Sequence, residues 1–184
     1  MATTTARRGL ASRFAAAREG STAVEFALVA LPFFAMLFAI LQTALVFFAD
    51  QVFESAVADA SRLIMTGQAQ TQNMTQAGFK NEICSRLISA FDCQGGVSVD
   101  VEVAASLGSA TPAAVAIKQG KIDSSSFGYS TGTGCSIITV RAAYAWPLFF
   151  TVLNFGLANV GSSHLLVATA VFRNEPFGSA SSCS

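Results

Sequence analysis

A single long apolar run dominates the N-terminal third of the chain. The 24 residues 26–49, FALVALPFFAMLFAILQTALVFFA, contain no formal charge. As a helix, this run would be roughly 36 Å long at about 1.5 Å per residue, enough to cross a hydrocarbon core of about 30 Å. Pro32 lies inside the run, where a membrane helix tolerates proline as a local bend. The pattern therefore predicts one membrane-spanning helix.

The helical pattern continues beyond the apolar run. Apolar residues recur every three or four positions as far as Ile64, which predicts one helix over residues 22–66. Gly67 is expected to end this helix, and the polar stretch QAQTQNMTQ that follows is typical of a loop. A second, short amphipathic helix is predicted over residues 79–91, with four apolar residues on one face: Ile83, Leu87, Ile88 and Phe91.

After the glycine pair at 95–96 the period of the pattern changes to two. Four valines alternate with polar residues, which predicts a half-buried strand. Residues 104–134 are rich in Gly, Ser, Thr and Ala and are expected to be mostly loop. The predicted strands are 97–103, 136–145 and 164–173. The predicted fold class is α+β: a long N-terminal helix, a short helix and a small antiparallel sheet of about three strands.

The zero net charge hides an asymmetry that predicts the topology. Residues 1–20 carry four Arg and one Glu, hence +3, while the rest carries seven Lys or Arg against ten Asp or Glu, hence −3. By the positive-inside rule the N-terminus is cytoplasmic and residues 50–184 lie on the other side of the lipid bilayer. The sequence shows no basic face that could bind the phosphate backbone of a nucleic acid, so nucleic acid is not an expected partner.

A second apolar stretch, residues 146–160, is too short to span a bilayer. It either packs into the core of the outer domain or forms a loop that touches the membrane surface or a partner subunit, with Trp146 at the interface. The sequence leaves both interpretations open.

All four cysteines fall on the predicted outer side, where an oxidising compartment allows disulfides to persist. Four cysteines allow three pairings. We favour Cys84 with Cys93, which bracket the end of the short helix, and Cys135 with Cys183 as the second pair; the alternative is that Cys183, in the tail GSASSCS, stays unpaired. A metal site is disfavoured because the chain has no CxxC and a single histidine.

The sequence offers no enzyme signature and implies no cofactor. It lacks G-x-S-x-G, a Gly-rich phosphate loop and HExxH. Four carboxylates of the outer part are scattered, and two of them, Asp100 and Glu102, lie on the polar face of the first strand. We expect these groups to be solvated and to take no part in acid–base chemistry. The carboxylates are those of Asp92, Asp100, Glu102 and Asp123.

The junction between the basic leader and the apolar run reads REGSTAVEF over residues 18–26. It resembles the type IV pilins, whose precursors are cut after a glycine by a membrane-embedded prepilin peptidase and carry glutamate at the fifth mature position. The resemblance implies cleavage between Gly20 and Ser21, which makes Glu25 the fifth residue. A carboxylate beside an apolar helix is costly unless it is paired. The resemblance implies that Glu25, followed by Phe26, pairs with the terminal amine of an adjacent subunit; otherwise Glu25 lies in the headgroup region.

Together with the strand endings YAWPL and ATAVFRNEPF, the segment GSTAVEFAL resembles the TadE-like proteins of the tight-adherence (Tad, Flp) pilus system. The resemblance covers residues 18–177. It implies a pseudopilin or minor pilin of the bacterial inner membrane whose partners are the prepilin peptidase, other pilin subunits and the Tad assembly platform. The FRNEPF ending has two interpretations. Arg173 and Glu175 form an exposed ion pair that stabilises the fold by under about 1 kcal/mol, or the ending is a docking surface.

The expected organisation is a cleaved cytoplasmic leader (1–20), a pilin-like helix (21–66), an outer α+β domain (67–177) and a tail (178–184). The alternative is an uncleaved single-pass anchor that carries a binding or adhesion domain. Release by signal peptidase at the A-x-A pattern of residues 56–58 is disfavoured, because the apolar run exceeds the usual h-region of about 7–15 residues.

Overall fold

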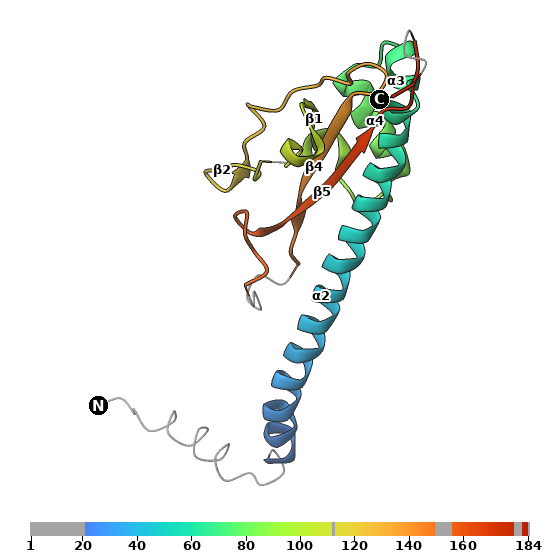
Figure 1. The fold of residues 1–184 in the computed structure, drawn as a ribbon. Coiled ribbons are helices and arrows are strands. Elements are labelled where there is room, and N and C mark those ends of the chain that lie inside the picture. The colour runs from blue at the N-terminus through green and yellow to red at the C-terminus, as the bar shows by residue number, and fades with distance from the viewer. Residues whose placement is uncertain (1–20, 112, 150–155, 179–181, 184) are drawn as a thin grey trace, which may run out of the picture. The chain divides into compact units, whose positions relative to one another are not determined.

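The computed structural model describes residues 21–111, 113–149, 156–178 and 182–183 (Figure 1). The chain divides into two compact units between Leu41 and Gln42. The first contains the start of a long helix, and the second, which we call the C-terminal unit, contains the end of that helix and every other element described. The predicted leader lies outside the described residues.

The long helix α2 runs from Ser21 to Met65 and continues through Pro32 without a break. These bounds confirm the predicted helix. Gly67 adopts a φ of 79° and its N–H donates to the carbonyl of Ile64 (3.1 Å). Glycine enters this left-handed conformation without the steric cost of a Cβ, so it ends the helix as predicted.

Three short helices follow, and two of the predictions made for this region are wrong. The stretch predicted as a loop contains helix α3, Gln68–Thr71. Helix α4 covers Gln76–Arg86 and therefore ends before the predicted position 91, and α5 covers Cys93–Gly96. Cys84 and Cys93 form a disulfide with Cα atoms 5.7 Å apart. Nine residues of continuous helix would separate them by about 13.5 Å, so the helix has to end between them.

The main sheet has the order β1-β4-β5 with antiparallel neighbours. Its strands are β1 (Ser98–Ala104), β4 (Ile137–Pro147) and β5 (Ser163–Arg173), which confirms the three predicted strands and the α+β fold class. Between β1 and β4 the chain is mostly irregular, as predicted. It contains only the short helix η2 (Leu107–Ser109) and the hairpin of β2 (Ile117–Lys118) and β3 (Lys121–Ile122) as regular elements among the described residues.

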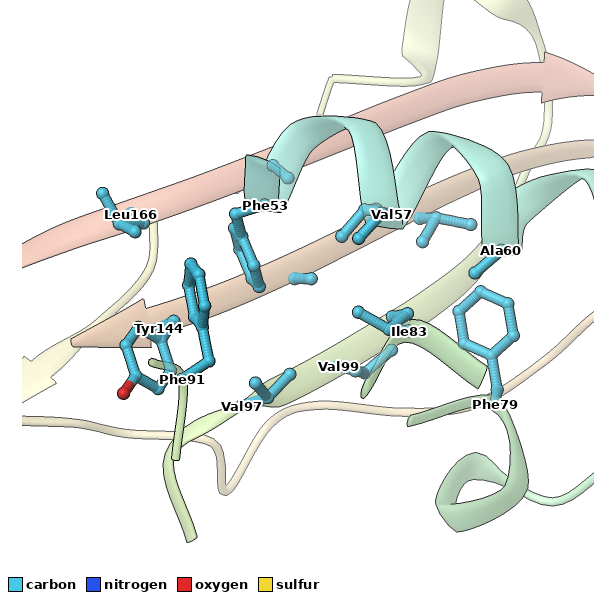
Figure 2. Close-up of a cluster of buried hydrophobic side chains, with 14 of the residues drawn as sticks. Phe53, Val57, Ala60, Phe79, Ile83, Phe91, Val97, Val99, Tyr144 and Leu166 are labelled. Carbon is cyan, nitrogen blue, oxygen red and sulfur yellow. The ribbon is translucent and has the colours of Figure 1, made fainter. Parts of the chain in front are cut away.

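The hydrophobic core lies between α2, α4 and one face of the sheet (Figure 2). Phe53, Val57 and Ala60 of α2 face Phe79 and Ile83 of α4 and Val99 of β1. An aromatic cluster closes one end of this core: the ring centroid of Phe91 lies 6.0 Å from that of Phe53 and 5.0 Å from that of Trp146. Phe91 therefore belongs to the core as the apolar pattern indicates, although it lies outside the helix predicted to carry it.

The apolar stretch 146–160 divides between core and surface. Trp146 is only 6% exposed, and Leu148 and Val160 are also buried. Phe149 is 67% exposed, and residues 150–155 lie outside the described part of the chain. Core packing therefore explains why part of this stretch is apolar, but it does not explain the apolar side chain at Phe149.

The irregular segment between β1 and β4 covers the other face of the sheet. Asp100 and Arg141 are register partners on β1 and β4, and their side chains form an ion pair of 2.5 Å. Asp100 also accepts from the N–H of Gly128 (2.8 Å), and the Arg141 guanidinium donates to the carbonyl of Ala113 and lies 4.9 Å from the centre of the Phe127 ring. The prediction of a solvated Asp100 is wrong, because it is 3% exposed and its partner 6%. Glu102 is exposed.

Candidate functional site

The N-terminal turns of α2 carry the residues to which the sequence assigns processing and subunit pairing. Ser21 is the first residue of the helix, and Glu25 lies one turn further on, with its side chain exposed. Phe26 is exposed beside it. Gly20 lies outside the described residues.

Beyond Glu25, α2 presents apolar side chains on every side. Its most apolar 18-residue stretch contains no buried residue, and the helix is long and apolar enough to cross a membrane. A helix that is apolar all round and unburied by its own chain is suited to lipid or to other apolar helices. The exposed large apolar residues of the first unit are Val24, Phe26, Leu28, Val29, Leu31, Phe33, Phe34, Met36, Leu37, Phe38, Ile40 and Leu41.

The FRNEPF ending fastens β5 to the far end of α2. The N–H of Glu175 donates to the carbonyl of Met65 (2.9 Å), one of the helix C-terminal carbonyls that have no partner within the helix. Asn174 is buried, and its side-chain amide donates to the carbonyls of Thr131 (3.0 Å) and Thr133 (2.9 Å). These contacts give the motif a structural role that the sequence analysis missed, because it depends on backbone groups distant in sequence.

The ring of Phe177 lies against Gly67 at the same place. A Cβ atom at position 67 would come within 2.8 Å of this ring. Glycine is therefore required at position 67 for two reasons: the backbone is left-handed, and the ring of Phe177 approaches closely. The end of α2 and the end of β5 are held as one piece.

Two disulfides join the four cysteines in the pairing favoured from the sequence, Cys84 with Cys93 and Cys135 with Cys183. The first encloses the turn between α4 and α5, and the second ties Cys135, two residues before β4, to the C-terminal tail. Among the described residues, no group of three or more His, Cys, Asp or Glu side chains is placed to hold a metal ion.

Removal of the local disulfide gives a direct measure of its contribution. The double variant Cys84→Ser, Cys93→Ser should lose about 2–3 kcal/mol of unfolding free energy, because the reduced unfolded chain regains the entropy of a loop of about ten residues. Trp146, the single tryptophan of the chain, reports unfolding of the C-terminal unit in detergent-solubilised full-length protein. Ser89→Ala, an exposed change inside the same loop, should shift stability by less than about 0.5 kcal/mol. Equal stabilities for both variants would contradict the prediction.

The described residues thus define a class of protein: a small disulfide-bonded α+β unit on a long helix that is suited to membrane insertion. Residues 20–62 match the family model of TadE-like proteins, which confirms the resemblance over this segment. The match begins at Gly20 and includes Glu25 and the apolar part of α2. Neither curated proteins nor solved structures contain a significant match to the chain.

Proposed function

We propose that this protein is a membrane-anchored pseudopilin, or minor pilin, required for assembly of a Tad (Flp) type IV-like pilus. The observation that carries the proposal is the TadE-like match over residues 20–62, which contains both the Gly20–Glu25 spacing and the exposed apolar helix. The role is structural and not enzymatic. Its partners are a prepilin peptidase, other pilin and pseudopilin subunits, and the inner-membrane assembly platform.

In this proposal the peptidase removes residues 1–20, and α2 then anchors the protein in the inner membrane. Residues 67–177 form a periplasmic domain, residues 178–184 its tail, and the disulfides suit an oxidising compartment. Glu25 remains at the cytoplasmic edge of the span, one turn from the new amino terminus at Ser21. That placement supports pairing of the carboxylate with the terminal amine of a neighbouring subunit.

Processing can be tested at Gly20. Gly20→Trp should leave the twenty-residue leader attached and block assembly, because a peptidase working beside the membrane has to admit a small, extended residue at the scissile bond. The intact mass and N-terminal sequence of membrane-extracted protein measure the outcome.

The matched control is Ala17→Trp, which places the same bulk three residues earlier and should be cut normally. An unchanged mature mass in the Gly20 variant would show that processing does not require glycine at this position, against the prediction. A wild-type protein that begins at Met1 would instead favour the uncleaved anchor with a binding or adhesion domain.

A further inference from the structure

The C-terminal unit has one end that lies level with the outer part of the apolar run. Glu175, which follows β5, bonds to Met65 at the far end of α2, whereas Tyr144 near the end of β4 lies 6.3 Å from Phe53. β4 therefore runs from the level of Met65 toward that of Phe53, alongside the part of α2 that belongs to the C-terminal unit (Figure 1). Pro147 is three strand residues beyond Tyr144, about 10 Å. This distance equals about seven helical residues, which places Pro147 near the level of Val46.

Near the level of Val46, the side chains of α2 change from fully exposed to partly buried by the C-terminal unit. The most apolar stretch of the helix contains no buried residue, but Gln42, Val46 and Ala49 are buried within the C-terminal unit. These three residues belong to the uncharged run 26–49 that is expected to cross the bilayer. The C-terminal unit therefore reaches down to the outer boundary of the hydrocarbon region.

Aromatic side chains are exposed at this end, which we call the membrane-side end and define by Phe47 and Phe48 of α2 and Phe149 after β4. Their exposed fractions are 67%, 55% and 67%. Phe48 also lines an open groove with Ile88, another exposed apolar side chain. Exposed aromatic residues from separate segments at one level are costly in water and favourable in the interfacial region of a bilayer.

The charge pattern agrees with contact to lipid. Residues 142–172 contain no Asp, Glu, Lys or Arg, although they include the whole connection between β4 and β5. Water-facing connections of a folded domain usually carry polar and charged side chains. A connection without charge next to a membrane anchor can enter the interfacial region without burying an unpaired charge.

We infer that the membrane-side end rests in the outer leaflet of the membrane that α2 spans, with Phe149 as its contact outside the helix. The partner is the phospholipid surface itself, continuous with the lipid around α2. The inference rests on the membrane anchoring in the proposed function. It gives the C-terminal unit two points of attachment to the bilayer, which would limit its tilt relative to the membrane.

The test uses full-length protein in phospholipid vesicles with and without brominated acyl chains. A single tryptophan is moved to the contact in the variant Trp146→Phe, Phe149→Trp. The control Trp146→Phe, Leu107→Trp places it on η2, beyond the opposite end of β1, where Leu107 is also exposed. The tryptophan at 149 should emit at shorter wavelength, lose fluorescence in brominated vesicles and resist acrylamide. The tryptophan at 107 should show the reverse.

Three outcomes would overturn the inference. Acrylamide quenching at 149 equal to that at 107 would place the residue in water, and protection from both quenchers would place it against protein. Failure of the protein to float with the vesicles would overturn the anchor itself, and so separates the proposed function from the lipid contact.

A second measurement leaves Trp146 in place. Phe149→p-benzoylphenylalanine should yield phospholipid adducts on irradiation, detected by intact mass, whereas the same replacement at Leu107 should yield none. Absence of adducts at 149 in floated protein would contradict the inference.

Discussion

Arg141→Ala should destabilise the C-terminal unit by about 3–5 kcal/mol, because it leaves the Asp100 carboxylate buried without its cation. Asp100 would keep its hydrogen bond from the N–H of Gly128, and the guanidinium contacts to Ala113 and Phe127 would also be lost. Domains of this size are stable by only about 5–15 kcal/mol, so the variant should unfold at much lower denaturant concentration. Urea unfolding followed by Trp146 fluorescence measures the loss.

The matched control is the ion pair of Lys118 and Asp123 at the β2–β3 hairpin, in which the Asp123 side chain is 16% exposed and the Lys118 side chain extends into solvent. The distance from Lys118 Nζ to Asp123 Oδ2 is also 2.5 Å, and a hydrogen bond from Lys118 lowers the pKa of Asp123 to about 2. Lys118 is 74% exposed, so solvent screens the pair and Lys118→Ala should cost less than about 1 kcal/mol. Similar losses of unfolding free energy in Arg141→Ala and Lys118→Ala would show that burial of the Asp100–Arg141 pair does not increase its contribution to stability.

Replacement of both members of the buried pair separates charge from packing. Asp100→Val with Arg141→Leu removes the two charges together, so neither is left uncompensated, and the double variant should be more stable than Arg141→Ala alone. A double variant as unstable as the single one would attribute the loss to packing of the irregular segment over the sheet.

The elements that the sequence predicts well are those specified by local periodicity. The helix ending at Gly67 follows from the repeat of apolar residues and a glycine that can adopt positive φ. The first strand follows from alternating valines, of which Val97, Val99 and Val101 lie in the core while Val103 at the end of the strand is exposed. In both cases the residues that determine the element are adjacent along the chain.

The errors occur where distant residues decide the structure. Asp100 looks solvated because it alternates with valines, but its environment is set by Arg141, 41 residues away, and by the irregular segment that covers both. The end of α4 is set by the disulfide to Cys93, and the role of FRNEPF by the last carbonyls of α2. None of these contacts leaves a periodic signal.

The candidate assembly site was predictable for a different reason. Gly20, Glu25 and the apolar run form one short motif that needs no tertiary contact to be seen in the sequence, and the family match covers it. The structure adds that Glu25 is exposed on a continuous helix that begins at Ser21. The proposed pairing with another subunit requires such a carboxylate, accessible beside an apolar surface.

Glu25→Ala should separate anchoring from assembly. Membrane insertion should be retained, because the change removes a carboxylate at the edge of an apolar run without shortening that run. Cleavage after Gly20 should also persist, since the scissile bond lies five residues away. Pairing with other pilin subunits should fail, because the amine of a neighbour would be left uncompensated in an apolar bundle. A loss of about 3–5 kcal/mol corresponds to a pairing constant lowered more than about 100-fold.

The measurement is co-purification of processed protein with the pilus machinery, together with a count of surface filaments. Glu54→Ala is the matched control, because Glu54 is an exposed glutamate of the same helix that lies beyond the apolar run. It removes an equal charge and should leave both readouts unchanged, which makes any loss in Glu25→Ala specific to position 25. Normal filaments and normal co-purification in Glu25→Ala would mean that this carboxylate is only a headgroup-level charge, and that pairing of the pilin type does not operate in this protein.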